Sequence, residues 1–146
     1  MNKQTYQEYP PIVRLAERLV VALEECVRRF ARYHKYTLGT ELRQQAQQVY
    51  RLSHRAWRDK AKQAEWLTQL VWAVDELKLS LQLGQQLKAF ASFGQFEQLA
   101  KLAAELGKQT GGWYKQQVRG QKPVPSEAQE ARPQILSTPA TLEVQP

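Results

Sequence analysis

The stretch that decides the fold is YTLGTELRQQAQQVYRLSHRAWRDKAK, residues 36–62. On a helical wheel turning by about 100° per residue, its small and apolar side chains gather on one face. They are Leu38, Leu42, Ala46, Val49, Ser53 and Ala56. A row of cations is centred about 170° away on the same wheel. It consists of Arg43, Arg51, Arg55, Arg58 and Lys62. The stretch therefore predicts a helix that packs on a core through one face and presents cations on the other.

The segment before this stretch predicts another amphipathic helix. Pro10 and Pro11 suit a first helical turn, where a missing N–H costs nothing, and apolar side chains then recur in helical rhythm for about six turns. The polar residues 31–36 interrupt that rhythm, so we expect the chain to turn there. We expect the Thr37 hydroxyl to cap the next helix. Gly39, early in that helix, is weakly disfavoured unless another segment approaches it closely.

Two more helices follow residue 62. The third is predicted over about 63–90. The fourth begins at Ser92, because Ser-x-x-Gln has the spacing of a capping box. A Gly-Gly pair at 111–112 predicts its end. We expect the Trp-Tyr pair at 113–114 to fold back as a lid on the end of the molecule.

The third predicted helix has apolar side chains on two faces. Its core stripe consists of Leu67, Leu70, Val71, Val74, Leu77, Leu81 and Gly84. A second stripe lies about 180° away. It consists of Trp72, Leu79, Leu83 and Phe90. Each helix of a small bundle keeps an outer face, so the second stripe favours a contact between subunits. The alternative is that the fourth helix or the N-terminal segment covers it.

Four helices with short connections predict an all-α fold, an antiparallel up-down-up-down four-helix bundle over residues 10–119. Residues 120–146 contain five of the seven prolines and few large apolar residues. Such a composition buries too little surface to offset the entropy of ordering. We therefore expect a disordered C-terminal tail.

The charge of the chain is unevenly distributed. The 146 residues carry 21 Lys and Arg against 14 Asp and Glu, and residues 28–62 alone hold ten of the cations against two carboxylates. A basic protein of this size commonly has a polyanionic partner, although some have none. One cysteine, no apolar leader and no membrane-length apolar run indicate a cytoplasmic protein without a membrane partner.

Motifs for catalysis, metals or cofactors are missing from the sequence. His34 and His54 lack the spacing of a metal site, and Cys26 lies on an apolar stripe, as buried cysteines do. Asp75 and Glu76 are adjacent, so they point about 100° apart on a helix and do not suit paired acid–base work. A solvated edge with a salt bridge is the simpler interpretation of that pair. We therefore predict no enzymatic activity, no metal and no cofactor.

The basic surface is what remains as a candidate site, and scattered cations suggest phosphate contact without sequence readout. The candidate nucleic-acid-binding residues are Arg28, Arg29, Arg32, Lys35, Arg43, Arg51, Arg55, Arg58 and Lys62. Tyr50 and Trp57 lie between the core face and the basic face. Their rings either stack on exposed bases or form the rim of the bundle.

Several short runs together resemble a known family. Tyr-Thr-Leu-Gly at 36–39 is followed by Leu-Arg at 42–43, Asp-Glu-Leu lies at 75–77, and LGKQTGGWYK at 106–115 closes the fourth predicted helix. This combination is similar to the accessory variability determinant (Avd) proteins of diversity-generating retroelements. These belong to a wider group of four-helix-bundle proteins that includes those encoded in ribosomal RNA intervening sequences. The resemblance covers about residues 10–116.

The resemblance implies a specific role. Avd proteins form basic pentamers that bind the reverse transcriptase of the element and its template RNA, and the complex makes mutagenised cDNA. They are not themselves the polymerase. By this resemblance we expect a homo-oligomer, a pentamer, with those two partners. The alternative is an oligomeric interaction module of the wider group that binds an acidic protein.

Overall fold

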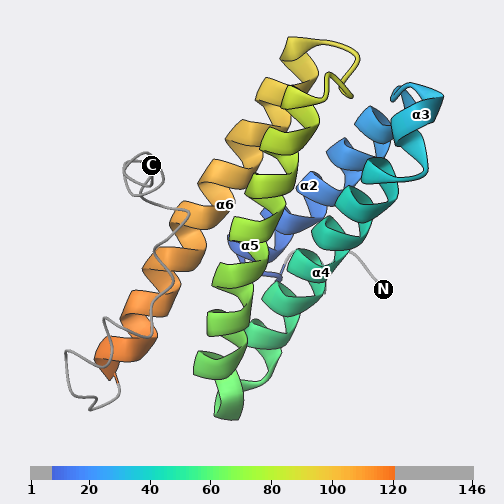
Figure 1. The fold of residues 1–146 in the computed structure, drawn as a ribbon. Coiled ribbons are helices and arrows are strands. Elements are labelled where there is room, and N and C mark those ends of the chain that lie inside the picture. The colour runs from blue at the N-terminus through green and yellow to red at the C-terminus, as the bar shows by residue number, and fades with distance from the viewer. Residues whose placement is uncertain (1–7, 121–146) are drawn as a thin grey trace, which may run out of the picture.

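The computed structural model describes residues 8–120, and within them the regular structure is entirely helical (Figure 1). The elements are α2 (Pro11–Arg28), α3 (Arg32–Lys35), α4 (Leu38–Arg58), the 3₁₀ helix η1 (Lys60–Lys62), α5 (Gln63–Gln86) and α6 (Phe93–Gly120). The prediction of an all-α chain with four long helices is thus confirmed. Residues 121–146, which include nearly all of the predicted tail, lie outside the described range.

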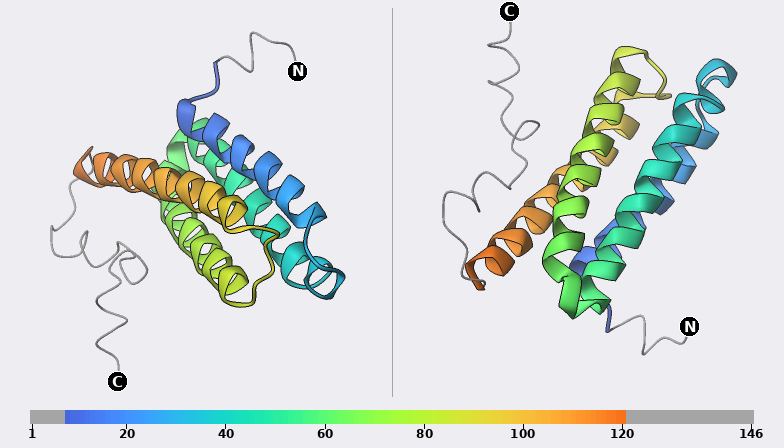
Figure 2. Two further views of the ribbon diagram at one scale, coloured as in Figure 1. Left: turned by 90° about the horizontal axis from the view of Figure 1, so that it is seen from above. Right: turned by 60° about the horizontal axis from the view of Figure 1, so that its bottom comes forward.

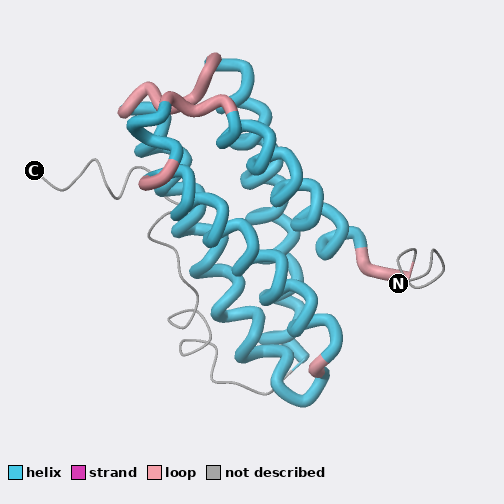
Figure 3. Tube along the Cα trace, turned by 90° about the vertical axis from the view of Figure 1, so that its right-hand side faces the viewer, coloured by secondary structure: helices cyan, strands magenta, loops and turns pink. Residues whose placement is uncertain are grey.

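The four long helices surround one core. α4 packs against α2 and α5, and α6 packs against α5 and α2, so that each helix has two neighbours (Figures 1 and 2). The connections at residues 29–37 and 87–92 lie at one end of the molecule, whereas the α4–α5 turn lies at the other (Figure 3). No helix within residues 8–120 is long and apolar enough to cross a bilayer.

The core is built from the predicted stripes. Every small or apolar position singled out on α4 is buried, as are all of the core-stripe positions on α5 except the half-buried Val71. The largest fully buried side chains come from all four long helices and include Leu19, Leu42, Leu70, Leu77 and Leu99. Full burial of each leucine side chain stabilises the folded state by about 1.5–3 kcal/mol relative to an exposed side chain.

The connection between α2 and α4 differs from the expected simple turn. Residues 32–35 form the short helix α3, and Thr37 does not cap α4 with its side chain. Instead, the Thr37 hydroxyl donates to the carbonyl oxygens of Tyr33 and His34, at 3.3 and 3.4 Å. The carbonyls at the end of a helix lack intrahelical partners, so the hydroxyl satisfies the end of α3. The capping prediction for Thr37 is wrong.

The α5 helix ends four residues earlier than predicted. Lys88 adopts a left-handed backbone with φ of 58°, and its N–H donates to the Gln85 carbonyl while the Ala89 N–H donates to that of Gly84. This pair of bonds is a Schellman motif, which ends a helix and usually has glycine at the left-handed position. Phe90 therefore leaves the helix and does not continue its second apolar stripe.

The α6 helix continues where a stop was predicted. It runs through Gly111 and Gly112 to Gly120, and Tyr114 is buried, so the Trp-Tyr pair does not fold back as a lid. The end of α6 is tied to the rest of the molecule by a buried amide. Gln117 donates to the Gln63 side-chain oxygen, and the Gln63 amide donates to the Ala56 carbonyl at 2.7 Å. These contacts and the burial of Tyr114 outweigh the roughly 1 kcal/mol that each glycine costs in a helix.

A close approach does exist at Gly39. A Cβ at this position would lie 2.8 Å from the Val27 side chain of α2 and 3.3 Å from the His34 carbonyl oxygen. Glycine thus lets the start of α4 lie directly against α2 and α3. The short distance gives a physical reason for a residue that is otherwise disfavoured early in a helix.

Candidate nucleic-acid interface

The outer face of α4 carries an arginine row near its C-terminal end. Arg51, Arg55 and Arg58 are all exposed, and at about 100° per residue they fall within a sector of about 60°. The adjoining η1 adds the exposed Lys60 and Lys62. The three arginines of α4 point outward because the buried positions of this helix occupy the opposite side of the helical wheel.

A second group of cations lies at the other end of the molecule. Arg28, Arg29 and Arg32 are exposed around α3, and Lys35 is half-buried with its ammonium 6.0 Å from the Tyr36 ring centroid. About 20 Å of α4 separates this group from the arginine row, at 1.5 Å per residue. The cations of residues 28–62 therefore form two groups in space.

Arg43, which lies between the two groups, is paired. Its Nε donates to Glu24 of α2 at 2.8 Å, and the two side chains form a salt bridge. Both side chains are partly exposed, so the pair contributes at most about 1 kcal/mol. Its position ties α4 to α2, and its charge is already matched. Arg43 is thus less available to a phosphate than an exposed arginine without a salt bridge.

The turn between α4 and α5 restrains one arginine of the row, Arg55. The Asp59 carboxylate accepts from Trp66 Nε1 at 3.0 Å and from the Lys62 backbone N–H at 3.3 Å. The hydrogen bond from Trp66, with smaller contributions from Lys62 and Ala61, lowers the pKa of Asp59. The Arg55 guanidinium lies over the Trp66 ring, 5.3 Å from its centroid, and such stacking restrains an otherwise mobile side chain.

Trp57 belongs to the rim of the bundle. Its ring makes edge-to-face contacts with Tyr9 and His54 at centroid distances of 5.0 and 5.4 Å, and the Arg58 guanidinium lies over it at 5.4 Å. Burial, together with the nearby Arg58 charge, lowers the pKa of His54, so the imidazole is neutral at pH 7. Tyr50 is half-buried, and burial raises its pKa. Both Tyr50 and Trp57 are half-buried and pack against the core.

The two most exposed aromatic rings among residues 8–120 were missed in the sequence. Tyr33 and Tyr36 are 84% and 69% exposed, more than any other large hydrophobic residue among residues 8–120. Both belong to the α3 segment and alternate with cations in the run Arg-Tyr-His-Lys-Tyr. That alternation is the signal that would have identified them.

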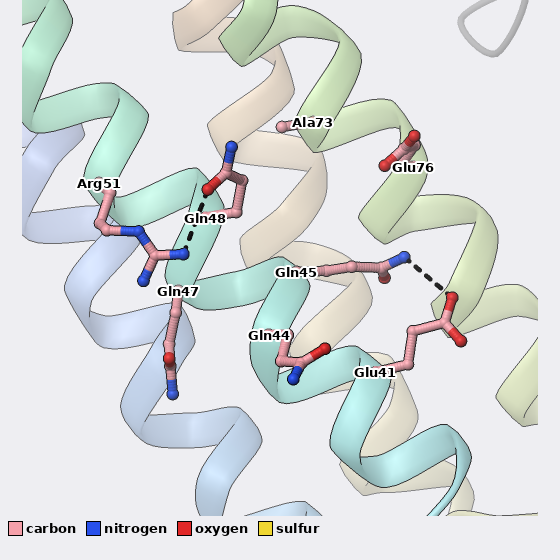
Figure 4. A pocket seen from close by; sticks show the side chains of 8 residues that line it. All are labelled: Glu41, Gln44, Gln45, Gln47, Gln48, Arg51, Ala73 and Glu76. Carbon is pink, nitrogen blue, oxygen red and sulfur yellow. Dashed lines mark hydrogen bonds between the residues drawn. The ribbon is translucent and has the colours of Figure 1, made fainter.

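A groove lined mainly by polar side chains adjoins the arginine row (Figure 4). It has a volume of about 500 Å³ and lies between α4 and α5. Its lining consists of Glu41, Gln44, Gln45, Gln47, Gln48, Arg51, Ala73 and Glu76. Arg51 Nη2 donates to Gln48 Oε1 at 3.2 Å, and Gln45 donates to Glu41 at 3.4 Å. The two carboxylates make this groove a poorer phosphate site than the arginine row beside it.

The candidate catalytic groups are buried or isolated. Cys26 is buried, and burial raises the pKa of its thiol. Asp75 is only 5% exposed, so the interpretation as a solvated edge holds for the exposed Glu76 and is wrong for Asp75. Within the described residues, no three His, Cys, Asp or Glu side chains are grouped to hold a metal ion.

The outer stripe of α5 is exposed in the single chain. Trp72, Leu79 and Leu83 are 43%, 55% and 51% exposed, and Leu87 extends the stripe at 46%. Phe90, in contrast, is 9% exposed and packs edge-to-face on Phe30. Neither α6 nor the described N-terminal residues cover the stripe. Leu87 thus takes the place in the stripe that the sequence assigned to Phe90.

Comparisons of this chain with protein-family models, with curated proteins and with solved structures found no match.

Proposed function

We propose that this protein is a non-catalytic accessory subunit of a diversity-generating retroelement, which binds template RNA through its cationic surface. The observation that supports RNA binding most directly is the set of exposed cations at 28–62, of which only Arg43 forms a salt bridge within residues 8–120. Surfaces that merely face solvent normally mix charges of both signs. An excess of unpaired cations instead attracts a polyanion and releases its counterions on binding.

The proposed mode of binding is contact with phosphates. Arg51, Arg55 and Arg58 present guanidinium groups, which match the geometry of phosphate oxygens. Because Arg55 and Arg58 stack on tryptophan rings, less side-chain entropy is lost when they bind. Such contacts position an RNA without reading its sequence.

The link to a retroelement rests on the family resemblance. It supplies the reverse transcriptase as protein partner, support of mutagenic cDNA synthesis as the role, and a homopentamer as the assembly. The helix contacts are consistent with the antiparallel up-down-up-down topology that this proposal includes. The exposed stripe of α5 supports self-association, and a pentamer would repeat the arginine row five times and increase its avidity.

The direct test is the salt dependence of RNA affinity, measured on the purified chain by fluorescence anisotropy. The logarithm of the affinity should fall linearly with the logarithm of the salt concentration. Replacing Arg51, Arg55 and Arg58 together by Glu should weaken binding by about 100-fold or more at low salt.

A matched control distinguishes the contribution of the arginine row to RNA affinity from that of net charge alone. Lys101, Lys108 and Lys115 are exposed on α6 at intervals of seven residues, so changing all three to Glu alters the net charge equally. We expect a loss below about tenfold from this control, because only the general attraction is reduced. Equal losses in both variants, or affinity independent of salt, would contradict the proposal.

A second candidate is an oligomeric interaction module that binds an acidic protein. The exposed stripe of α5 favours it, since contiguous apolar side chains on a surface mark protein contacts. Recovery of a protein partner after nuclease treatment, combined with no RNA binding by the purified chain, would favour this candidate.

A further inference from the structure

We propose that the tyrosine pair, Tyr33 of α3 and Tyr36 directly after α3, forms a stacking site for unpaired nucleobases. The inference rests on the proposed RNA binding and adds the class of RNA: single-stranded. The pair is defined by its exposure, 84% and 69%. Leaving two tyrosine rings in water forgoes burial that would stabilise the fold, so a role in packing does not account for them.

The charges around the pair suit a nucleic acid. Arg28, Arg29 and Arg32 are exposed around α3, and the Lys35 ammonium lies 6.0 Å from the Tyr36 ring centroid. Residues 28–37 contain no Asp or Glu. Aromatic faces flanked by cations allow bases to stack while the adjoining phosphates contact the charges.

The backbone that carries the two rings is held firmly. The Thr37 hydroxyl donates to the carbonyls of Tyr33 and His34, and the His34 and Lys35 N–H groups both donate to Ala31 at 2.9 and 3.0 Å. The rings of His34 and Tyr33 pack in a T-shaped arrangement, with 5.0 Å between their centroids. A restrained ring loses little entropy when a base stacks on it, which favours binding.

The stacking of the RNA bases determines whether the tyrosine pair can bind single-stranded or double-stranded RNA. Bases inside a duplex are stacked on each other and present no free face, whereas unpaired bases can splay onto aromatic side chains. The arginine row contacts phosphates, which both forms carry. The tyrosine pair should therefore affect single strands alone, and the arginine row should affect both forms.

The experiment compares a 20-nucleotide oligouridylate with a blunt RNA duplex of equal length, using the full chain. Replacing Tyr33 and Tyr36 together by Ala should lower the single-strand affinity by about tenfold or more and leave duplex affinity and the salt slope unchanged. The double change to Phe keeps both rings and should retain the wild-type affinity. Phe93, 60% exposed on α6, provides the control, and its change to Ala should have no effect.

Three results would overturn the stacking site. An unchanged single-strand affinity in the double Ala variant overturns the stacking site while leaving phosphate binding by the arginine row intact. An equal loss for single strand and duplex overturns it too, because the pair would then support the cationic surface in general. No binding of either RNA by the wild-type chain refutes the stacking site together with the proposed function.

Discussion

Helices α4 and α5 make an instructive comparison, because they contribute alike to the core and differ on the outside. Each buries eight residues, and the two pack against each other across the turn at Asp59. The outer face of α4 presents the arginine row, whereas that of α5 presents Trp72, Leu79, Leu83 and Leu87. Both helices thus bury the same number of residues, and they differ in the outer surface that each presents to a partner.

The largest expected effect is on the oligomeric state, and it distinguishes the outer face of α5 from that of α4. Changing Leu79 and Leu83 together to Glu places two charges on the proposed subunit contact, so light scattering should report the mass of a single chain where the wild type is an oligomer. The triple Glu variant of the arginine row should keep the wild-type mass and lose RNA binding. A monomeric wild type would remove the assembly role from the α5 stripe.

The next effect concerns how α4 is seated against α2. Gly39→Ala introduces a methyl group 2.8 Å from the Val27 side chain, and we expect a loss of about 1–2 kcal/mol in unfolding free energy, since overpacking exceeds the gain in helix propensity. Urea denaturation followed by circular dichroism measures it. Gly112→Ala is the control, because a Cβ there meets nothing within 4 Å. It should stabilise α6 by about 0.5–1 kcal/mol, and a gain at both positions would argue against the tight seating.

The smallest expected effect concerns the end of α5. Lys88→Gly removes the steric cost of a side chain at φ of 58°, so the variant should gain about 0.5–1 kcal/mol after the greater freedom of unfolded glycine is counted. Lys88→Ala, which retains a Cβ, should show no such gain. Thermal and urea unfolding of both variants decide the point. Equal stability of the Gly and Ala variants would contradict the strained end of α5.

Much of the fold could be predicted, because helical periodicity is a local property. The core positions of α4 follow from spacings of three and four residues, and Ser92 was correctly predicted to start α6, since its Oγ accepts from the Gln95 N–H at 3.2 Å. The ends of helices were predicted less well. Lys88 gives no sign of a left-handed residue. The glycine pair at 111–112 indicated a stop, which the burial of Tyr114 and the hydrogen bond of Gln117 override.

The candidate site could also be predicted only in part from the sequence. The cations were identified by composition, and most are exposed, but the pairing of Arg43 with Glu24 joins residues 19 positions apart. The aromatic rings chosen from the wheel, Tyr50 and Trp57, pack on the rim. The two most exposed rings, Tyr33 and Tyr36, lie within and directly after α3. This helix has four residues and is too short to leave a periodic signal.

The sequence by itself determined that the chain is helical, which face of each long helix enters the core, and that its positive charge is concentrated in residues 28–62. These features depend on neighbours within about one or two helical turns. Only the tertiary structure decided where α5 ends, that α6 continues, that Phe90 is internal and that Tyr33 and Tyr36 are exposed. Each of those depends on which distant side chains supply burial and hydrogen bonds, and such contacts can outweigh the small free energies of local propensity.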